Sequence, residues 1–474
     1  MTLKSLTAIL LLCFSPMFSQ EKLHEIKLNL PDKSYSIRII DEENKQVTLL
    51  TSTHDSIIVH KFDSNFKIID SLKTETPFDI FNFISGHSVD ENNLKLFWMT
   101  NDDKRLLSKT YNYHTKEIIE NDYDLVFENE IIIQRFIVNK KFYILSLVKN
   151  TSLLKFHIFS DNGKHEIKEV DFSGLSFYGK KTQEKNFYKI LTGSAFEAWL
   201  NLTTITNDKP ASLLLGKRKL YINEKNITFS FDINPMLTQL FTIDLVDFSF
   251  KEEQVQQPNF ELSESSTPKS NSFLINDKLF QIKLTSEKLV LNITDSDRTK
   301  SKQFEAIPDN EITFNNSEMT QEDGSTNKLI ILEKTNQFIR KTNNYDCAVS
   351  SFVSGDNYVV TLGSRIYIDS GSSSVAPMYG AVGALISVAL THKSNVYNPN
   401  PYKSYRVVYT HCLFDKNLNH IEDKVQKTAF DMARIYADNL KNQTNTTFFK
   451  FNSMMYIGSF DKNLKKYTFK GFAD

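Results

Sequence analysis

The residues that could carry out chemistry are thinly spread along the chain. A thiol nucleophile needs a base within reach, and His411 beside Cys412 supplies both groups. Adjacent residues of a strand point to opposite faces of a sheet, so we do not expect this pair to share a proton. His54 and His60 would lie on one face of a strand but too far apart to bind one metal ion.

Carboxylates are numerous, and hydrolysis of a glycosidic bond needs only two of them on opposite sides of the substrate. The candidates in turn-forming stretches are Asp90, Glu91, Asp102, Asp103, Asp295 and Asp297. Isolated carboxylates in turns are usually solvated, so we predict no catalytic role for these six. The sequence also lacks a phosphate-binding loop, a Gly-x-Ser-x-Gly elbow and zinc-ligand spacing. We therefore predict no catalytic residue, no cofactor and no metal site.

The chain contains three cysteines, of which Cys13 lies in the N-terminal segment. Cys347 and Cys412 would close one long disulfide loop in an oxidising compartment. Two separate buried thiols are the equal alternative, because sequence alone cannot bring two Cα atoms within bridging distance.

Residues 1–19 have the order of a secretory signal. Lys4 precedes an apolar stretch that ends before Pro16, and small Ser19 marks a cleavage point. Leu12 is not the small residue that lipidation of Cys13 would require. We expect export to the periplasm, the outer surface or the medium, with no transmembrane span in the mature chain.

Composition describes a folded chain without a strong charge bias. Of its 474 residues, 40% are hydrophobic, which is enough to form a core and excludes a disordered protein. The 56 basic side chains nearly balance the 57 acidic ones, which argues against a nucleic-acid binder.

Strands dominate the sequence from about residue 34. Short runs of β-branched and aromatic residues alternate with polar ones, with breaks at turn-forming residues such as Asn139-Lys140. Units of four such runs in about 40 residues match the size of a propeller blade. The units span residues 35–74, 79–120, 132–172, 211–256 and 270–308.

A hairpin motif recurs in these units. An apolar strand ends in Phe-Asp, two turn residues follow, and a lysine-rich strand comes next. The motif occurs at Asp63, Asp415 and Asp461, whose side chains we expect to cap the turn backbone.

Two stretches depart from the strand pattern. Small and apolar residues gather in an insertion at residues 371–404, which either packs on a sheet or contacts a partner. Its candidate contact residues are Val375, Met378, Tyr379, Val382 and Leu385. Apolar residues at helical spacing predict a short helix over residues 427–440.

The signal, the Phe-Asp hairpins and the composition together resemble secreted β-propeller-like proteins of flavobacteria and other Bacteroidetes. Asp55-Ser56-Ile57 and Asp70-Ser71-Leu72 are similar to the O-glycosylation acceptor of that phylum, which makes Ser56 and Ser71 candidate glycosylation sites. The resemblance implies no reaction.

We predict an all-β fold over residues 34–474, a propeller of six or seven four-stranded blades whose last strands close against an N-terminal strand. The alternative is two β-sandwich domains divided near residue 260.

Two functions stay open. One is a non-enzymatic protein of the cell envelope that binds a protein or glycan through a propeller face or the insertion. The other is an enzyme that acts on extracellular polysaccharide through carboxylates around the propeller axis.

Overall fold

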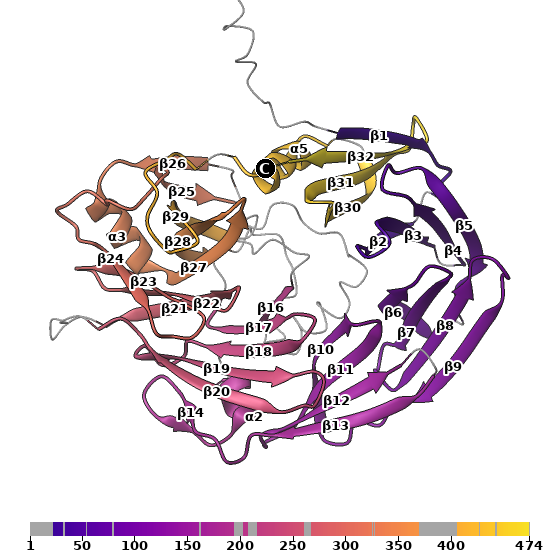
Figure 1. The fold of residues 1–474 in the computed structure, drawn as a ribbon, viewed down its shortest axis with the longest axis horizontal. Helices are drawn as coiled ribbons and strands as arrows, with labels where there is room; N and C mark the ends of the chain where they lie inside the picture. Colours follow the sequence, from indigo (N-terminus) through magenta and orange to yellow (C-terminus); the bar gives the residue numbers. More distant parts are fainter. Residues whose placement is uncertain are drawn as a thin grey trace, which may run out of the picture.

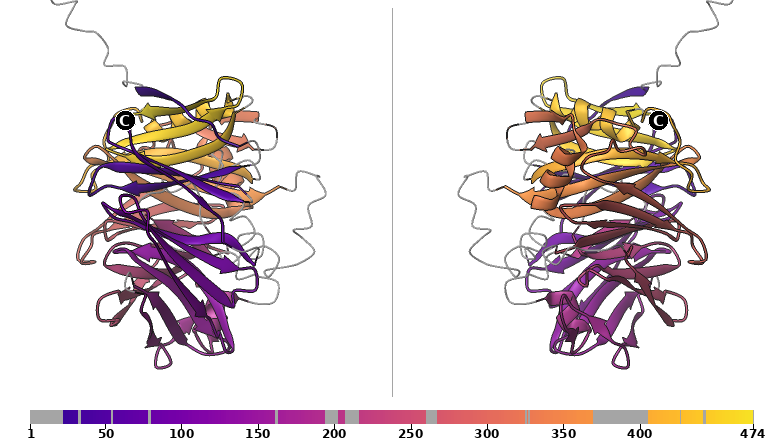
Figure 2. Two further views of the ribbon diagram at one scale, coloured as in Figure 1. Left: turned by 90° about the vertical axis from the view of Figure 1, so that its right-hand side faces the viewer. Right: turned by 90° about the vertical axis from the view of Figure 1, so that its left-hand side faces the viewer.

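The computed structural model describes residues 22–31, 34–53, 55–77, 80–160, 163–193, 202–206, 216–259, 267–324, 326, 328–368, 405–425, 427–440 and 443–473. Within these residues, seven sheets of four or five strands follow one another around a ring. Figure 1 looks down the ring and Figure 2 shows it from two sides. The fold is a β-propeller, as the sequence predicted.

The seven blades take up the chain in sequence order. Blade 1 comprises β2 (Tyr35–Asp41), β3 (Gln46–Ser52), β4 (Ser56–Phe62) and β5 (Ile68–Glu75). Blade 2 comprises β6 (Phe81–Val89), β7 (Asn93–Thr100), β8 (Arg105–Asn112) and β9 (Ile118–Asp124). Blade 3 comprises β10 (Glu130–Val138), β11 (Lys141–Val148), β12 (Leu153–Phe159) and β13 (His165–Asp171). Blade 4 comprises β16 (Leu202–Thr206), β17 (Arg218–Ile222), β18 (Asn226–Phe231), β19 (Leu237–Asp244) and β20 (Phe250–Gln256).

Blades 5, 6 and 7 complete the ring. Blade 5 comprises β21 (Lys269–Ile275), β22 (Lys278–Leu284), β23 (Leu289–Thr294) and β24 (Ser301–Ala306). Blade 6 comprises β25 (Met319–Asp323), β26 (Lys328–Leu332), β27 (Asp346–Ser354), β28 (Asn357–Tyr367) and β29 (Tyr405–Phe414). Blade 7 comprises β30 (Gln443–Phe451), β31 (Met454–Asp461), β32 (Lys466–Phe472) and the N-terminal β1 (Lys22–Lys27).

The ring closes through its two ends. Strand β1 pairs antiparallel with β32, with Lys22 opposite Gly471 and Lys27 opposite Lys466. The Lys466 ammonium also lies 2.8 Å from the Glu25 carboxylate. This confirms the predicted closure. The alternative of two sandwich domains is wrong, because side chains bond across residue 260, as between Lys219 and Asn271 at 2.7 Å.

Two blades depart from the simple four-stranded order. In blade 4, β16 adds a parallel strand beside β17. In blade 6, the strand order is β26-β25-β29-β28-β27, so β26 is the outermost strand (Figure 1). A small sheet of β14 (Phe177–Tyr178) and β15 (Gln183–Glu184) precedes helix α2 (Phe187–Thr192).

The predicted hairpin turns form as expected. The Oδ1 atom of Asp63 accepts hydrogen bonds from the backbone N–H groups of Asn65 and Lys67. Asp415 accepts the equivalent backbone bonds from Asn417 and Asn419. Asp461 accepts from the backbone N–H groups of Asn463 and Leu464. Each carboxylate therefore satisfies turn donors that would otherwise depend on water.

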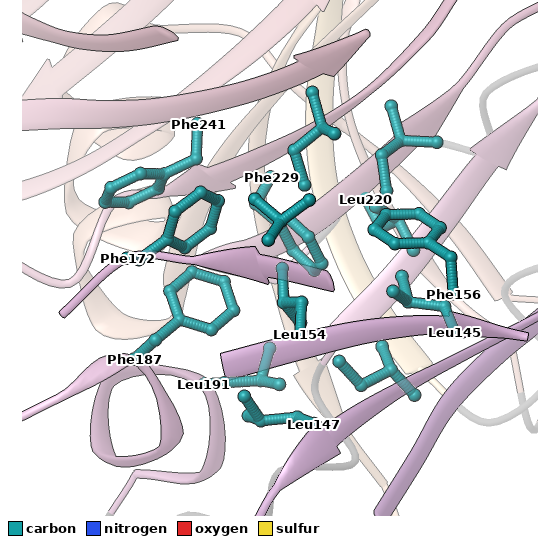
Figure 3. Packing of buried hydrophobic residues seen from close by; sticks show 14 of the residues in the cluster. Leu145, Leu147, Leu154, Phe156, Phe172, Phe187, Leu191, Leu220, Phe229 and Phe241 are labelled. Carbon is teal, nitrogen blue, oxygen red and sulfur yellow. The ribbon is translucent and has the colours of Figure 1, made fainter. Parts of the chain in front are cut away.

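The core lies in the seams between blades. Figure 3 shows the seam of blades 3 and 4, where α2 inserts Phe187 between the two sheets. The Phe187 ring meets Phe172 edge-on at 5.1 Å and Phe241 at 5.6 Å. Such edge-to-face packing adds to the free energy that aromatic burial contributes. A second large cluster joins blades 5 and 6.

Helix α5 (Ala429–Asp438) confirms the helix predicted within residues 427–440. Thr428 and Asp431 form a capping box at its start. Ala433 packs with Phe448 and Met455 of blade 7. None of the helices in the described ranges is long and apolar enough to cross a membrane.

Candidate functional site

A polar groove lies between blade 5 and helix α3 (Thr335–Asn344) of blade 6. The helix was not predicted, because its buried positions include two threonines. Thr335, Phe338, Ile339 and Thr342 form the buried face. Phe338 and Ile339 join the core shared by blades 5 and 6. One face of α3 is thereby fixed to the propeller, and the opposite face is left to line the groove.

Blade 5 holds the C-terminal end of α3 in place. The Lys269 ammonium of β21 donates to the carbonyl oxygens of Asn343, at 2.6 Å, and Tyr345, at 2.9 Å. These carbonyls have no partner within the helix, and the positive charge suits the negative end of the helix dipole. Lys341 also hydrogen bonds to Gln321 of β25. The groove therefore has a rigid wall.

The main cavity of the groove has a volume of about 630 Å³. It is lined by Ser286, Pro308, Lys334, Asn336, Gln337, Arg340, Asn343 and Asn344. Ser286 comes from the β22–β23 turn and Pro308 from the segment after β24, so blade 5 supplies one wall. Helix α3 and its cap residue Lys334 supply the other wall.

The lining of the main cavity is rich in amides and carries net positive charge. Asn336, Gln337, Asn343 and Asn344 each offer a donor and an acceptor. Arg340 and Lys334 add positive charge, and no carboxylate lines this cavity. The Asn343 Oδ1 atom is hidden from solvent and has no hydrogen-bond partner in the described part of the chain.

A second cavity of about 420 Å³ shares Pro308, Lys334 and Asn336 with the first. Asp309, Glu311 and Glu333 bring carboxylates to it, and all three are exposed to solvent. Exposed carboxylates lack the apolar surroundings that retain a proton on a general acid. The second cavity is therefore better suited to hydrogen bonding than to acid catalysis.

A buried cluster in blade 3 contains the residue types of a hydrolase triad in the wrong order. Glu130 Oε2 accepts from Ser146 Oγ at 2.5 Å and lies 3.1 Å from His157 Nε2. The carboxylate thus stands where a triad places its histidine, and the imidazole does not contact the serine hydroxyl. Burial lowers the pKa of His157. Burial would raise the pKa of Glu130, but bonds from Ser146, His157 and Lys155 outweigh it and lower that pKa.

A second buried cluster joins blades 4 and 5. The Lys219 ammonium lies 2.8 Å from Asp232 Oδ2, and both side chains are fully buried. Asp232 also accepts from Thr238 Oγ1 and from the backbone and hydroxyl of Ser272. Because neither side chain is exposed to solvent, this network connects two blades and has no open side for a substrate.

The structure separates the remaining residues singled out in the sequence. His411 hydrogen bonds to Thr361 while Cys412 lies in the core, so they face opposite sides as expected. His54 lies outside the described residues, and no cluster of three or more His, Cys, Asp or Glu in the described part could hold a metal ion. Asp102 caps an exposed turn, as expected for a solvated turn carboxylate. Asp103 differs from that prediction, because its carboxylate pairs with Arg135 of blade 3 at 2.6 Å.

The two cysteines are free and buried. Cys347 pairs with Ser364 on one side of β28, and Cys412 pairs with Val360 on the other side. Strand β28 therefore lies between the two cysteines. Of the two alternatives left open by the sequence, the structure shows two separate buried thiols and not a disulfide.

Ser56 begins β4 and is half-buried, with its hydroxyl 3.1 Å from that of Thr53. Ser71 is exposed on β5. Glycosylation of either remains a prediction. The signal at residues 1–19 and the contact residues Val375, Met378, Tyr379, Val382 and Leu385 lie outside the described residues.

The groove could not be found from the sequence. Its walls come from residues 286, 308 and 334–344, which only the packing of blade 5 on α3 brings together. The repeated amides of Asn336, Gln337, Asn343 and Asn344 at helical spacing were the one available signal.

No protein-family model and no curated protein matches the sequence. Solved structures are similar at the level of fold. The WD40 domain of SCAP from fission yeast is 12% identical, with a TM-score of 0.32, and the match covers 94% of this chain and 85% of that one. An oligogalacturonate lyase in complex with manganese is 10% identical, with a TM-score of 0.35, and covers 96% and 98%. These likenesses carry no argument about function.

Proposed function

We propose that the chain is an exported, non-enzymatic binding protein of the cell envelope, and that the groove beside α3 binds an acidic glycan. The observation that carries the proposal is the lining of the main cavity, where helix α3 and its cap residue present four amides and two cations and where no carboxylate is present. The proposal of export rests on the signal-like order of residues 1–19.

Amide side chains suit a sugar for a chemical reason. A hydroxyl group both donates and accepts a hydrogen bond, and each Asn or Gln side chain offers both partners in one plane. Arg340 and Lys334 would pair with a carboxylate or sulfate on the sugar, because charge-assisted hydrogen bonds are the stronger ones. A neutral glycan would leave these two cations without a partner.

The alternative is an extracellular enzyme that acts on polysaccharide. The three carboxylates of the second cavity favour it, since a glycosidase needs two such groups around the bond. They lie beside α3 and not around the propeller axis. Loss of hydrolysis in a Glu311→Gln and Glu333→Gln double variant would support this alternative.

A polysaccharide microarray followed by calorimetry tests the proposal. The mature protein should bind acidic glycans in preference to neutral ones. The double variant Asn336→Ala with Arg340→Ala should weaken binding about tenfold or more, because it removes two polar contacts of about 1 kcal/mol each. Alanine is the best helix former, so α3 should stay folded.

A matched control uses the exposed turn of blade 1. The double variant Asn65→Ala with Lys67→Ala also removes one amide and one cation, and the structure places both side chains in solvent. It should bind as the wild type does. Equal binding by the groove variant and the wild type would overturn the assignment of the site.

A further inference from the structure

An amine, an amide and a carboxylate meet in the buried network between blades 4 and 5. Lys219 lies on β17, Asp232 follows the end of β18, and Asn271 lies on β21. The Lys219 Nζ atom is 2.8 Å from Asp232 Oδ2 and 2.7 Å from Asn271 Oδ1. Lys219 and Asp232 are fully buried, and Asn271 is 2% exposed. A nucleophile, a carbonyl carbon and a proton acceptor are thus held together where water is excluded.

Burial prepares Lys219 to act as the nucleophile. An ammonium group has no lone pair, so attack on a carbonyl carbon requires the neutral amine. Desolvation lowers the pKa of Lys219, although the neighbouring Asp232 charge acts in the opposite direction. Transfer of one proton from the ammonium to this carboxylate removes two buried charges at once, and buried charges are costly.

The side-chain amide of Asn271 is placed to act as the electrophile. Its carbon is bonded to Oδ1 at about 1.2 Å, so it lies within about 4 Å of Lys219 Nζ. The terminal torsion of an asparagine is soft, and its rotation brings the carbon to the amine. The backbone N–H of Ser272 donates to Asn271 Oδ1 at 2.8 Å. This donor stabilises the negative charge that develops on the oxygen during attack.

Asp232 is better suited to carry protons than to form the new bond. Its carboxylate accepts from Thr238 Oγ1 at 2.7 Å and from the backbone and hydroxyl of Ser272 at 2.9 Å each. Hydrogen bonds to a charged acceptor are strong ones and stabilise the carboxylate. A carboxylate resists nucleophilic attack because it already carries a negative charge. The uncharged amide of Asn271 is therefore the group that Lys219 attacks.

We propose that Lys219 and Asn271 join in a side-chain amide bond that links blades 4 and 5 covalently, with Asp232 as the catalytic proton carrier. The Nζ–Cγ bond forms and the Cγ–Nδ2 bond breaks. Of the three protons of the ammonium, one stays on the new amide nitrogen, one leaves with Nδ2 as ammonia, and one remains on Asp232. Atoms and charges balance without an outside reactant. The inference is independent of what the groove beside α3 binds.

The new bond supplies a covalent link that the described cysteines do not provide. Cys347 and Cys412 are both free. Lys219 and Asn271 are 52 positions apart in the sequence, so a bond between them constrains the unfolded chain as a disulfide across the same loop does. Because the bond joins β17 to β21, blades 4 and 5 cannot separate at that point even when the surrounding packing loosens.

Peptide mapping of the full mature chain by mass spectrometry tests the proposal. Trypsin should leave Lys219 uncleaved and release a branched peptide that contains Lys219 and Asn271, lighter by one ammonia, about 17 Da, than the two segments together. Lys219→Met and Asp232→Ala, checked for folding by circular dichroism, should give linear peptides only. Ammonia lost elsewhere, as from Gln20 at the predicted mature N-terminus, would be lost by the wild type and both variants alike.

The same map contains its own control. Lys302 also hydrogen bonds to an asparagine, Asn419, but this bond is exposed, so water stabilises the ammonium and these peptides should stay linear. Lys283→Met removes another buried lysine and should keep the branched peptide. Linear peptides alone from the wild type overturn the proposal, and this result needs no variant to fold. A branch at Asp232 with loss of water, about 18 Da, overturns the assignment to Asn271. Full branching in Asp232→Ala overturns the catalytic role of that carboxylate.

Discussion

Blades 3 and 6 differ in strand number, strand order and the elements added to the sheet. Blade 3 has four strands in sequence order, a seam filled by apolar rings and an outer edge rich in charge. Blade 6 adds a strand, a helix and a long connection between β28 and β29, and its outer edge is aliphatic. A regular blade mainly supports the ring, whereas helix α3 of blade 6 lines the groove for which we propose binding.

The largest effect is expected in the core of blade 3. Phe156 is fully buried in the seam with blade 4. Phe156→Ala should reduce the free energy of unfolding by about 3–5 kcal/mol, from lost burial and the cavity left behind. Urea unfolding followed by circular dichroism measures it. A loss below about 1 kcal/mol would show that this seam does not carry the stability we assign to it.

A smaller loss is expected where blade 5 holds α3. Lys269→Met keeps most of the apolar stem but removes the ammonium that caps two carbonyls. The cost should be about 2 kcal/mol, the scale of hydrogen bonds to a charged group. In the Lys269→Met variant, hydrogen exchange should be faster than in the wild type in the last turn of α3, and it should be unchanged in blade 3. Unchanged protection of that turn would mean that the cap is dispensable.

Acid should weaken blade 3 through His157. Burial lowers its pKa below the ordinary value of 6.5, so the unfolded chain binds the proton more readily than the folded one. Stability is thus retained above pH 6.5 and falls as the pH drops through the folded pKa. His157→Gln should lose less stability than the wild type between pH 7 and pH 5. The exposed residue His114 provides the control, since His114→Gln should keep the wild-type slope.

The smallest stability effect is expected in the groove of blade 6. Arg340 is exposed and contributes to no core cluster in the described part of the chain. Arg340→Ala should leave the free energy of unfolding within about 0.5 kcal/mol of the wild type. A loss as large as that of Lys269→Met in the same urea titration would assign Arg340 a structural role and remove it from the proposed site.

Local signals predicted most of the regular blades. Turn residues and alternating strands located blades 1, 3 and 5, and Asp63 and Asp461 behave as the hairpin motif predicted. Helix α5 was predicted from its apolar period, whereas α3 was missed because Thr335 and Thr342 occupy buried positions where apolar residues are the usual signal. The fifth strand β26 and the groove depend on contacts between distant segments, which no local pattern encodes.

The most direct test of the account is hydrogen–deuterium exchange of the mature protein with and without an acidic oligosaccharide selected on the microarray, with a neutral glucan oligosaccharide as the control. We expect slower exchange in peptides that cover residues 334–344 and 308–312, no change in blade 3, and no effect of the neutral sugar. Protection confined to other blades, or equal protection by both sugars, would contradict the assignment of an acidic-glycan site beside α3.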